Sequence, residues 1–288
     1  MSACIEMMRR AFLELRSGKA VNQPRRRLIL PSGSVLHQMA GSFGAYFATK
    51  IYSSNRKHGG LHQVFVHLYD AETGRPIAIM EANVMSEVRT GAATGYATEL
   101  LSAPDASVLG IIGSGLQART QVEAIRAVRP IHEVRVWSPT PEHAARFAAD
   151  LNCTLAETAE AAVRGASIVV TATTAKDPVI EAEWIAPGTF VAAMGANMAN
   201  RRELPEALVR LAGLVAVDDL AQARVEAGDL NLLEDGSNVV ELKDVDAGYD
   251  PARITIFKSL GIAVQDAAAA AYVYEQAVRK SMGQPLPQ

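Results

Sequence analysis

The sequence predicts an α/β protein of two domains, and three features of its patterning lead to this class. From about residue 106, short apolar strands alternate with helices, which indicates a parallel sheet with helices on both faces. Earlier in the chain, strand-like segments follow one another directly, which favours a mostly antiparallel meander. A short polar break at residues 102–106 separates the two patterns, and 288 residues are enough for two domains.

The first part of the chain begins with an amphipathic helix at residues 3–17, where Ile5, Met8 and Phe12 recur at helical spacing. A run of strands is expected next, and a second helix follows with Asn83 as its N-cap. The strands are Arg27–Pro31, Val35–Met39, Tyr46–Ser53, His62–Tyr69 and 75–81, and the second helix is 84–101.

The second part carries the alternating elements. Its strands are expected at 108–112, 133–137, 167–172, 189–193 and 213–217, and its helices at 115–128 and 141–150. The stretch 226–253 is rich in Gly, Asp and Asn and is expected to be irregular, and 262–281 is expected to form an alanine-rich helix. Four acids, Asp218 and Asp219 at the end of a strand and Asp229 and Asp235 in the loop beyond, could line the cleft, but the preferred interpretation is that they are solvated.

The composition excludes several classes of protein. A net charge of −3 gives no reason to expect a nucleic-acid or membrane partner, and no apolar run has the length of a membrane helix. Two distant cysteines and the lack of a signal-peptide pattern favour a reducing, cytoplasmic setting. We expect no metal site at His58, His62 and His67, because Gly59-Gly60 breaks any helix that would align them.

The most informative motif joins a short apolar strand to the next helix. Gly113-Ser114-Gly115 ends the strand and Leu116-Gln117-Ala118 begins the helix. The first glycine permits a tight turn, the second leaves room for a pyrophosphate, and the alanine allows close packing. The helix start adds unpaired N–H groups and a positive dipole end. The motif therefore predicts a Rossmann-type site for NAD or NADP.

The tip of the next strand bears on the choice of nucleotide. An acid there would bind the adenosine ribose and favour NAD, but the strand ends in Ser138-Pro139-Thr140. These hydroxyls suit a 2′-phosphate, with His143 or Arg146 nearby, although no arginine occupies the tip itself. We expect a slight preference for NADP.

Several segments together resemble the ornithine cyclodeaminase/μ-crystallin family across nearly the whole chain. They read "PRRRLILP", "HQMAGSFGAYFATKIYSSN", "SEVRTGAATGYAT", "GIIGSGLQA", "GANMANRREL", "EAGDL" and "IFKSLGIAVQDAAAA". The resemblance implies a substrate-binding and dimerisation domain of residues 1–105 and 256–288, an α+β domain completed by the C-terminal helix, and a Rossmann domain of residues 106–255. It also implies a homodimer, and a chain that starts after the first strand usual in this family.

The resemblance further implies which residues act. Arg26 and Arg89 match arginines that hold the substrate carboxylate, and the planar guanidinium suits that task. Lys50 matches a lysine that faces the reacting carbon and nitrogen, and partial desolvation would lower its pKa. Met39 joins them as a substrate contact and Asn197 as a catalytic candidate. The cofactor-binding candidates are Thr90, Gly113, Ser114, Gly115, Leu116, Gln117, Ser138, Thr140, Thr171, Ala172 and Thr173.

Two departures from the cyclodeaminase pattern affect the expected reaction. Asn197 stands where the cyclodeaminases carry an aspartate, and an amide cannot act as a base near neutral pH. His37, two residues before Met39, stands where they carry an acid. We therefore expect an NAD(P)-dependent reductase of an α-imino acid, of the ketimine reductase or amino-acid dehydrogenase type. The alternatives are ornithine cyclodeaminase, which forms proline and ammonia, and a non-catalytic NADP-bound crystallin-like protein.

Overall fold

The structure is a computed structural model that describes residues 1–231 and 238–284, without the side chains of Arg56, Leu61 and His62. Asp235 lies outside the described residues, so its expected solvated role is not addressed. None of the helices in the described ranges is long and apolar enough to cross a membrane.

The chain divides into two compact units, each with its own sheet. The unit that we call the antiparallel unit comprises Ala3–Arg89 and Gly261–Gln288. The other, which we call the parallel unit, comprises Met1–Ser2 and Thr90–Leu260. The chain therefore leaves the antiparallel unit in the middle of one helix and returns to it after the last strand.

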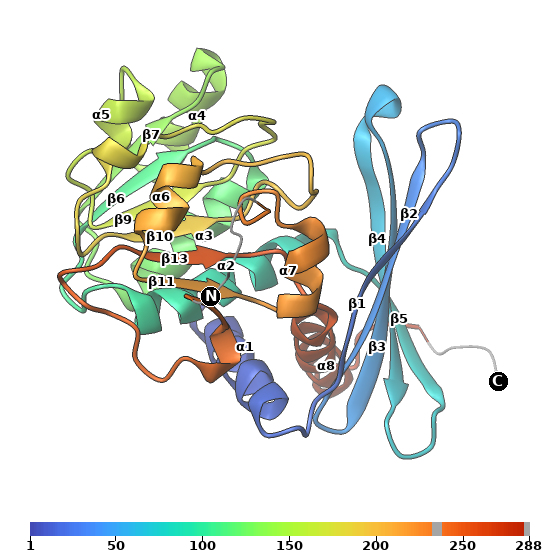
Figure 1. Cartoon of the computed structure of the whole chain (residues 1–288). Helices are drawn as coiled ribbons and strands as arrows, with labels where there is room; N and C mark the ends of the chain where they lie inside the picture. The colour runs from blue at the N-terminus through green and yellow to red at the C-terminus, as the bar shows by residue number, and fades with distance from the viewer. Residues whose placement is uncertain (232–237, 285–288) are drawn as a thin grey trace. The chain divides into compact units, whose positions relative to one another are not determined.

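The antiparallel unit contains five strands that pair in sequence order, each antiparallel to the next (Figure 1). Short turns connect consecutive strands, as expected for a meander. Its elements are α1 (Ser2–Arg16), β1 (Asn22–Ile29), β2 (Val35–Phe43), β3 (Tyr46–Asn55), the 3-10 turn Arg56–His58, β4 (Gly60–Asp70), β5 (Pro76–Glu81) and α8 (Ala263–Arg279).

The two faces of this sheet differ, because side chains alternate along each strand. Met39 and Val66 are buried on the face that also carries Lys50, whereas Phe65 is exposed on the other face. Helix α8 runs along the buried face (Figure 1). A Cβ on Gly41 of β2 would lie 2.6 Å from the backbone nitrogen of Val264, so glycine allows this close approach.

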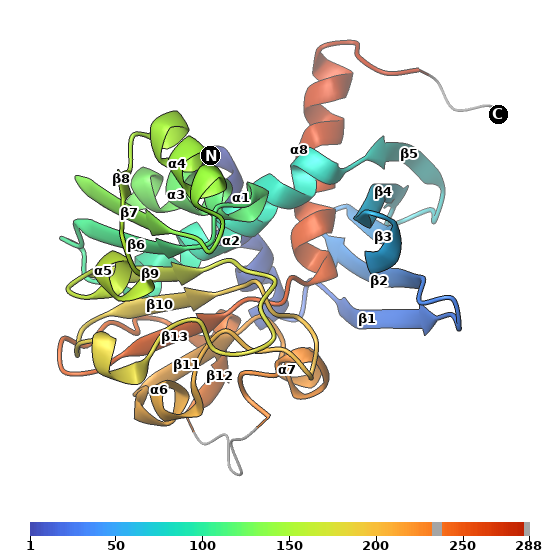
Figure 2. The ribbon, with the colours of Figure 1, turned by 90° about the horizontal axis from the view of Figure 1, so that it is seen from above.

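The parallel unit contains eight strands in the order β12-β11-β13-β10-β9-β6-β7-β8, all of them parallel (Figure 2). The strand order reverses between β6 and β9, which is the switch point of a Rossmann-type sheet. The elements are α2 (Asn83–Leu101, which starts in the antiparallel unit), β6 (Val108–Ile112), α3 (Leu116–Val128), β7 (Glu133–Trp137), α4 (Pro141–Leu151), β8 (Thr154–Leu155), α5 (Ala159–Val163), β9 (Ile168–Thr171), the 3-10 turn Ala182–Trp184, β10 (Phe190–Ala193), α6 (Glu206–Leu211), β11 (Leu214–Val217), α7 (Leu220–Glu226), β12 (Val239–Glu241), the 3-10 turn Leu242–Asp244 and β13 (Thr255–Lys258).

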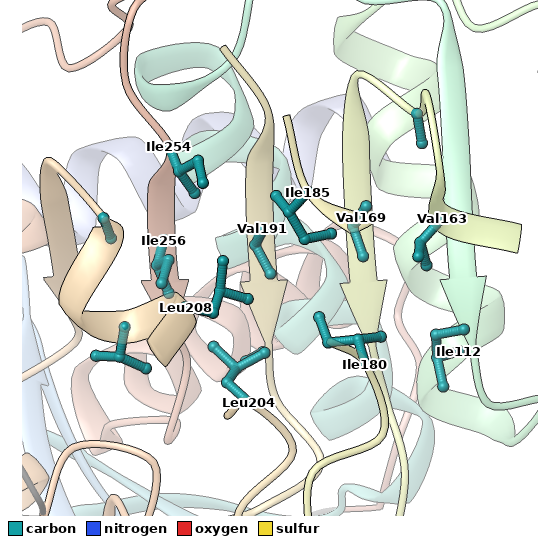
Figure 3. Close-up of a cluster of buried hydrophobic side chains, with 14 of the residues drawn as sticks. Ile112, Val163, Val169, Ile180, Ile185, Val191, Leu204, Leu208, Ile254 and Ile256 are labelled. Carbon is teal, nitrogen blue, oxygen red and sulfur yellow. The ribbon is translucent and has the colours of Figure 1, made fainter. Parts of the chain in front are cut away.

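An aliphatic cluster covers one face of the parallel sheet. Figure 3 shows Val169, Val191 and Ile256 from neighbouring strands pointing to one side, where Leu204 and Leu208 meet them. Each of these side chains is at most 1% exposed. Strands buried on both faces read as continuous apolar runs, which is why the sequence pattern identified them.

The predicted α/β class is confirmed, and most predicted elements are present. The strands 108–112 and 133–137 have the expected bounds. The prediction of an irregular stretch at 226–253 was partly wrong, because it contains β12 and a 3-10 turn. Strand β13 was not anticipated, although it lies in the middle of the sheet between β10 and β11.

The unit boundaries also differ from the expected residues 105 and 256. The later part of α2 belongs to the parallel unit, since Arg129 donates hydrogen bonds to the carbonyls of Thr98 and Glu99. The second boundary follows β13, because this strand is hydrogen-bonded within the parallel sheet. The polar break at residues 102–106 therefore does not mark the boundary between the units. The boundary lies within α2, where the contacts of the helix change from one unit to the other.

Candidate functional site

The loop between β6 and α3 has the geometry of a dinucleotide-binding turn. Gly113 has a φ of +109°, a value that favours glycine, and an added Cβ would lie 2.4 Å from the carbonyl oxygen of Ala172. Its amide donates to the carbonyl of Trp137 at 2.9 Å. These contacts hold the turn at the carboxyl ends of β6, β7 and β9, beside the switch point.

Gly115, at the N-cap of α3, is different. An added Cβ would meet nothing within 4 Å, and its φ of −78° is available to any residue. No side chain caps the helix at this residue, and Leu116 beside it is 63% exposed. The fold does not require a glycine here, but the close approach of a pyrophosphate does. The residues present therefore fit a dinucleotide phosphate on the N-terminus of a 13-residue helix.

The other cofactor candidates fall into two groups. Ser138 and Thr140 lie directly beyond β7, partly or largely exposed, so their hydroxyls remain accessible. Thr171 is fully buried at the end of β9, and the hydroxyl of Thr173 is hydrogen-bonded to Glu203. The amides of Ala172 and Thr173 are also engaged, with the carbonyl of Ile112 and with Glu203, so a cofactor role for this segment stays a prediction.

A buried acidic network connects the loops that follow β9 and β10. Glu203 accepts hydrogen bonds from the Thr173 amide at 2.7 Å and from the Gly195 amide at 2.6 Å. Asp229 accepts from the Glu203 amide at 2.6 Å and pairs with Lys258 at 2.8 Å. Burial raises the pKa of Glu203, although the Lys258 charge opposes that shift. The expectation that Asp229 is solvated was wrong, because it is 3% exposed.

Asp218 was also expected to be solvated and is buried. Its Oδ2 accepts a hydrogen bond from the Leu260 amide at 2.5 Å. Asn197 is half-buried in the loop after β10, two residues beyond Gly195. The hydrogen bond from the Gly195 amide to the Glu203 carboxylate fixes the start of this loop. The catalytic role of Asn197 stays a prediction.

Lys50 is the centre of a second group of residues, in the antiparallel unit. It lies on β3 opposite Met39 of β2 and is 4% exposed. Its Nζ donates to Ser86 Oγ at 2.6 Å and to Asp266 Oδ1 at 2.9 Å. Burial, reinforced by the charge of Arg89, lowers its pKa to about 7, although Asp266 opposes the shift. Both protonation states are therefore populated near neutral pH.

Arg89 shares the same carboxylate. Its Nε donates to Asp266 Oδ1 at 2.9 Å, and its Nη1 donates to Gln265 Oε1 at 2.7 Å. Burial alone would raise the pKa of Asp266, but Arg89 and Lys50 outweigh that effect and the pKa is lowered. Asp266 lies in the first turn of α8, where the helix dipole also favours a carboxylate.

Asp266 was missed by the sequence reasoning. Asp266 binds both Lys50 and Arg89, which were predicted to act together. It lies 216 positions away from Lys50 in the sequence, so no local pattern connects the two residues. The signal that could have identified Asp266 is its position within the apolar run of α8. An acid in such a run is expected to be buried, and a buried carboxylate needs a cationic partner.

Arg26 is not brought to this group. It pairs with Gln38, so it faces away from Met39 and Lys50, and it is exposed. A register shift between Gln23 and Arg26 turns the preceding residue to the other face, and Arg25 Nη2 donates to the carbonyl of Gly261 at 3.1 Å. The structure therefore places Arg25, not Arg26, beside the start of α8.

Known proteins are similar to this chain over most of its length. The model of the ornithine cyclodeaminase/mu-crystallin family matches residues 1–281. The ketimine reductase mu-crystallin of Mus musculus is 38% identical over 219 residues, which cover 74% of this chain and 69% of that protein.

Solved structures are similar over nearly the full length. The Delta(1)-pyrroline-2-carboxylate reductase of Thermococcus litoralis, in complex with NADH and L-proline, has a TM-score of 0.92 and 31% identity, covering 98% of this chain and 95% of that one. An archaeal alanine dehydrogenase dimer with bound NAD has a TM-score of 0.93 and 31% identity, covering 100% and 94%.

Proposed function

The chain belongs to the ornithine cyclodeaminase/mu-crystallin family and is an NAD(P)-dependent oxidoreductase of carbon–nitrogen bonds, and we propose that it reduces an α-imino acid to the amino acid. The observation that carries this proposal is the buried Lys50, whose pKa of about 7 suits proton transfer to a nitrogen. Ketimine and pyrroline-2-carboxylate reductases among the similar proteins support the same reaction class.

The proposed site binds the substrate carboxylate through guanidinium groups. Asp266 and Gln265 occupy Nε and Nη1 of Arg89, and its other N–H donors suit a carboxylate. We propose Arg25 as the second arginine that binds the carboxylate, because its side chain lies on the same face of the sheet as Lys50. Arg26, which the resemblance implied, lies on the opposite face. Met39, opposite Lys50, would form the apolar floor beneath the substrate.

The chemical step asks for one hydride and one proton. A reduced nicotinamide nucleotide held by the Gly113–Gly115 turn and the start of α3 would provide the hydride that the α-carbon receives. The electron pair of the C=N bond then stays on nitrogen, which takes a proton from Lys50. Asp266 keeps the lysine in place and stabilises its protonated form before transfer. We propose that Asn197 orients the imine by hydrogen bonding alone.

The first alternative is the cyclodeaminase reaction. Release of ammonia from ornithine needs a base for the second nitrogen, and the amide of Asn197 cannot supply one. We therefore propose that L-ornithine is not converted to proline. The second alternative is a crystallin-like protein that binds the nucleotide without catalysis. A reductase differs from it by consuming NADH or NADPH when an imine is supplied.

For the nucleotide we propose a slight preference for NADP over NAD. This rests on Ser138 and Thr140 beyond β7, where an acid would favour the ribose hydroxyls of NAD.

A steady-state assay tests the proposed function. Purified protein is supplied with NADH or NADPH and with Δ1-pyrroline-2-carboxylate, or with a 2-oxo acid and an amine, and the nicotinamide absorbance is followed. We expect consumption that depends on the imine. Proline and ammonia formed from NAD and L-ornithine, or binding of nucleotide without any turnover, would each overturn the proposal.

A further inference from the structure

The loop that follows β10 is closed at its base by a side chain of its own. Gly195 begins this loop and Glu203 ends it, and the Gly195 amide donates to Glu203 Oε2 at 2.6 Å across eight positions of the chain. Asn197 lies between these two ends and is half-buried. Compact loops whose ends are held together are frequently functional, and here the closure fixes the part of the loop that carries Asn197.

The Glu203 carboxylate also reaches the loop after β9. Its Oε1 accepts from the Thr173 amide at 2.7 Å and from the Thr173 hydroxyl at 2.8 Å. The backbones of the two loops are in direct contact, because a Cβ on Gly195 would overlap the Thr173 carbonyl oxygen. Ala172, the preceding residue, lies against Gly113 of the nucleotide turn in the same way. The carboxylate therefore joins the loop after β10 to a segment that adjoins that turn.

Other buried charges hold Glu203 in place. Its backbone amide donates to Asp229 Oδ1 at 2.6 Å, and Asp229 pairs with Lys258 at 2.8 Å. All three residues are at most 3% exposed. Three N–H and O–H donors converge on the Glu203 carboxylate, which is the pattern expected for an ionised acceptor. A buried polar network that is satisfied in this way is rigid, so it can set the position of the loops that it binds.

We propose that Glu203 is a positioning residue of the reductase, which holds the loop carrying Asn197 in the position that catalysis needs. In this role Glu203 acts through the amides of Gly195 and Thr173 and not on the substrate itself. A displacement of about 1 Å in a group that orients the substrate can cost about a hundredfold in rate. This inference rests on the proposed function, which gives Asn197 the task of orienting the imine.

Glu203→Gln tests the role with almost no change of shape. An amide has one acceptor oxygen, so its NH2 group must face the N–H of either Gly195 or Thr173, and one of the two bonds is lost. We expect kcat for the imine that is reduced fastest in the steady-state assay to fall about tenfold. The KM of that imine and the dissociation constants of NADH and NADPH should change less than about threefold. A kcat within about twofold of the unaltered protein would overturn the proposal.

Glu226→Gln is the matched control. Glu226 is 1% exposed and accepts a hydrogen bond from Gln222 on the same helix, α7, so this substitution also removes a buried carboxylate. Its kcat should stay within about twofold of the unaltered protein. An equal fall of kcat in both variants would attribute the loss to general destabilisation and would overturn the specific role of Glu203.

A double-mutant cycle tests whether Glu203 acts through Asn197. Asn197→Ala should lower kcat by itself, and Glu203→Gln added to it should lower kcat by less than about twofold more. Two effects that multiply in the double variant would show that Glu203 acts through another group, against the proposal. An unchanged kcat in Asn197→Ala would overturn both the role given to Asn197 and this inference.

Hydrogen exchange provides a readout that needs neither substrate nor nucleotide. In the unaltered protein, the amides of Gly195 and Thr173 should exchange slowly, because a buried carboxylate holds them. Exchange in the loop after β10 should be faster in Glu203→Gln and unchanged in Glu226→Gln. Rapid exchange of these amides in the unaltered protein, or no change in Glu203→Gln, would overturn the inference. Failure of every imine to consume NADH or NADPH would instead overturn the proposed function, whatever the exchange shows.

Discussion

A lysine that is 4% exposed and hydrogen-bonded to a carboxylate can serve as an acid only if its proton is labile. Burial makes it so, because desolvation disfavours the charged amine and lowers the pKa to about 7 from 10.5. Asp266 limits the shift and keeps the protonated form populated at the pH of the cell. The hydrogen bond to Asp266 therefore has two effects: it holds the Lys50 amine in place, and it limits how far burial lowers the pKa of that amine.

The pH dependence of the two reaction directions follows from this pKa. Imine reduction needs protonated Lys50, so its kcat/KM should fall as pH rises through about 7. Amine oxidation needs the neutral amine, so its kcat/KM should rise through the same range. Rate profiles of both directions across neutrality check this. The Lys50→Arg variant, whose guanidinium cannot lose its proton, should be slow and should show no change of kcat/KM with pH near 7. If the pH dependence is unchanged in this variant, it arises from another group.

Arg25 and Arg26 provide a second comparison between neighbouring residues. Arg25→Gln should raise KM for the imino acid by about tenfold, because one charged hydrogen bond to the carboxylate is lost. Arg26→Gln should have the smaller effect, since its side chain is on the other face of β1. Steady-state KM values for both variants decide the matter. A larger loss in the Arg26 variant would restore the role that the family resemblance implied.

At the scale of elements, the β6–α3 turn separates what the fold needs from what the ligand needs. Gly115→Ala should leave the free energy of unfolding nearly unchanged, because its Cβ meets nothing within 4 Å. Gly115→Asp should abolish NADH and NADPH binding by placing a carboxylate where the pyrophosphate approaches. Nucleotide fluorescence titration and denaturant unfolding measure the two effects. Unchanged affinity in the Asp variant would remove the nucleotide from this loop.

The end of β7 should set the choice of nucleotide. Ser138→Asp places a carboxylate where it can bind the ribose hydroxyls of NAD and repel a 2′-phosphate. The ratio of kcat/KM for NADPH to that for NADH should therefore fall by about tenfold or more. Glu142→Gln, in the first turn of α4, tests whether nearby charge alone acts. A ratio that does not fall would place the 2′-group elsewhere.

Local signals predicted the elements better than they predicted the site. The turn at Gly113 was identified because its strand, glycines and helix are adjacent in sequence. Asp266 was not, because its partners Lys50 and Arg89 come from distant segments. Arg26 was named from the family resemblance, and the register shift in β1, which a residue pattern cannot reveal, places Arg25 on the Lys50 face instead. Asp229 seemed solvated because the amides that satisfy it are unknown until the loops are folded.

At the scale of the whole molecule, the antiparallel sheet has a second face with an apolar surface. Leu28, Phe65 and Ile79 on it are 58%, 37% and 57% exposed. Leu36, Ile51 and Phe65 help line a hollow of about 660 Å³ on this unit. An exposed apolar sheet face marks an interaction surface, and we propose that the second copy of a homodimer, which the family resemblance implied, covers it.

The oligomeric state tests this last proposal. Light scattering after size exclusion should give about twice the chain mass of 30.7 kDa. Ile79→Glu with Phe65→Glu puts two charges on the proposed interface, where desolvation without a partner is unfavourable, and should yield monomers. Leu211→Glu alters an apolar residue of α6 that is 65% exposed in the other unit, and it should leave the dimer intact. A dimer that survives the double substitution would show that the subunits meet through another surface, and a wild-type monomer would refute the assembly itself.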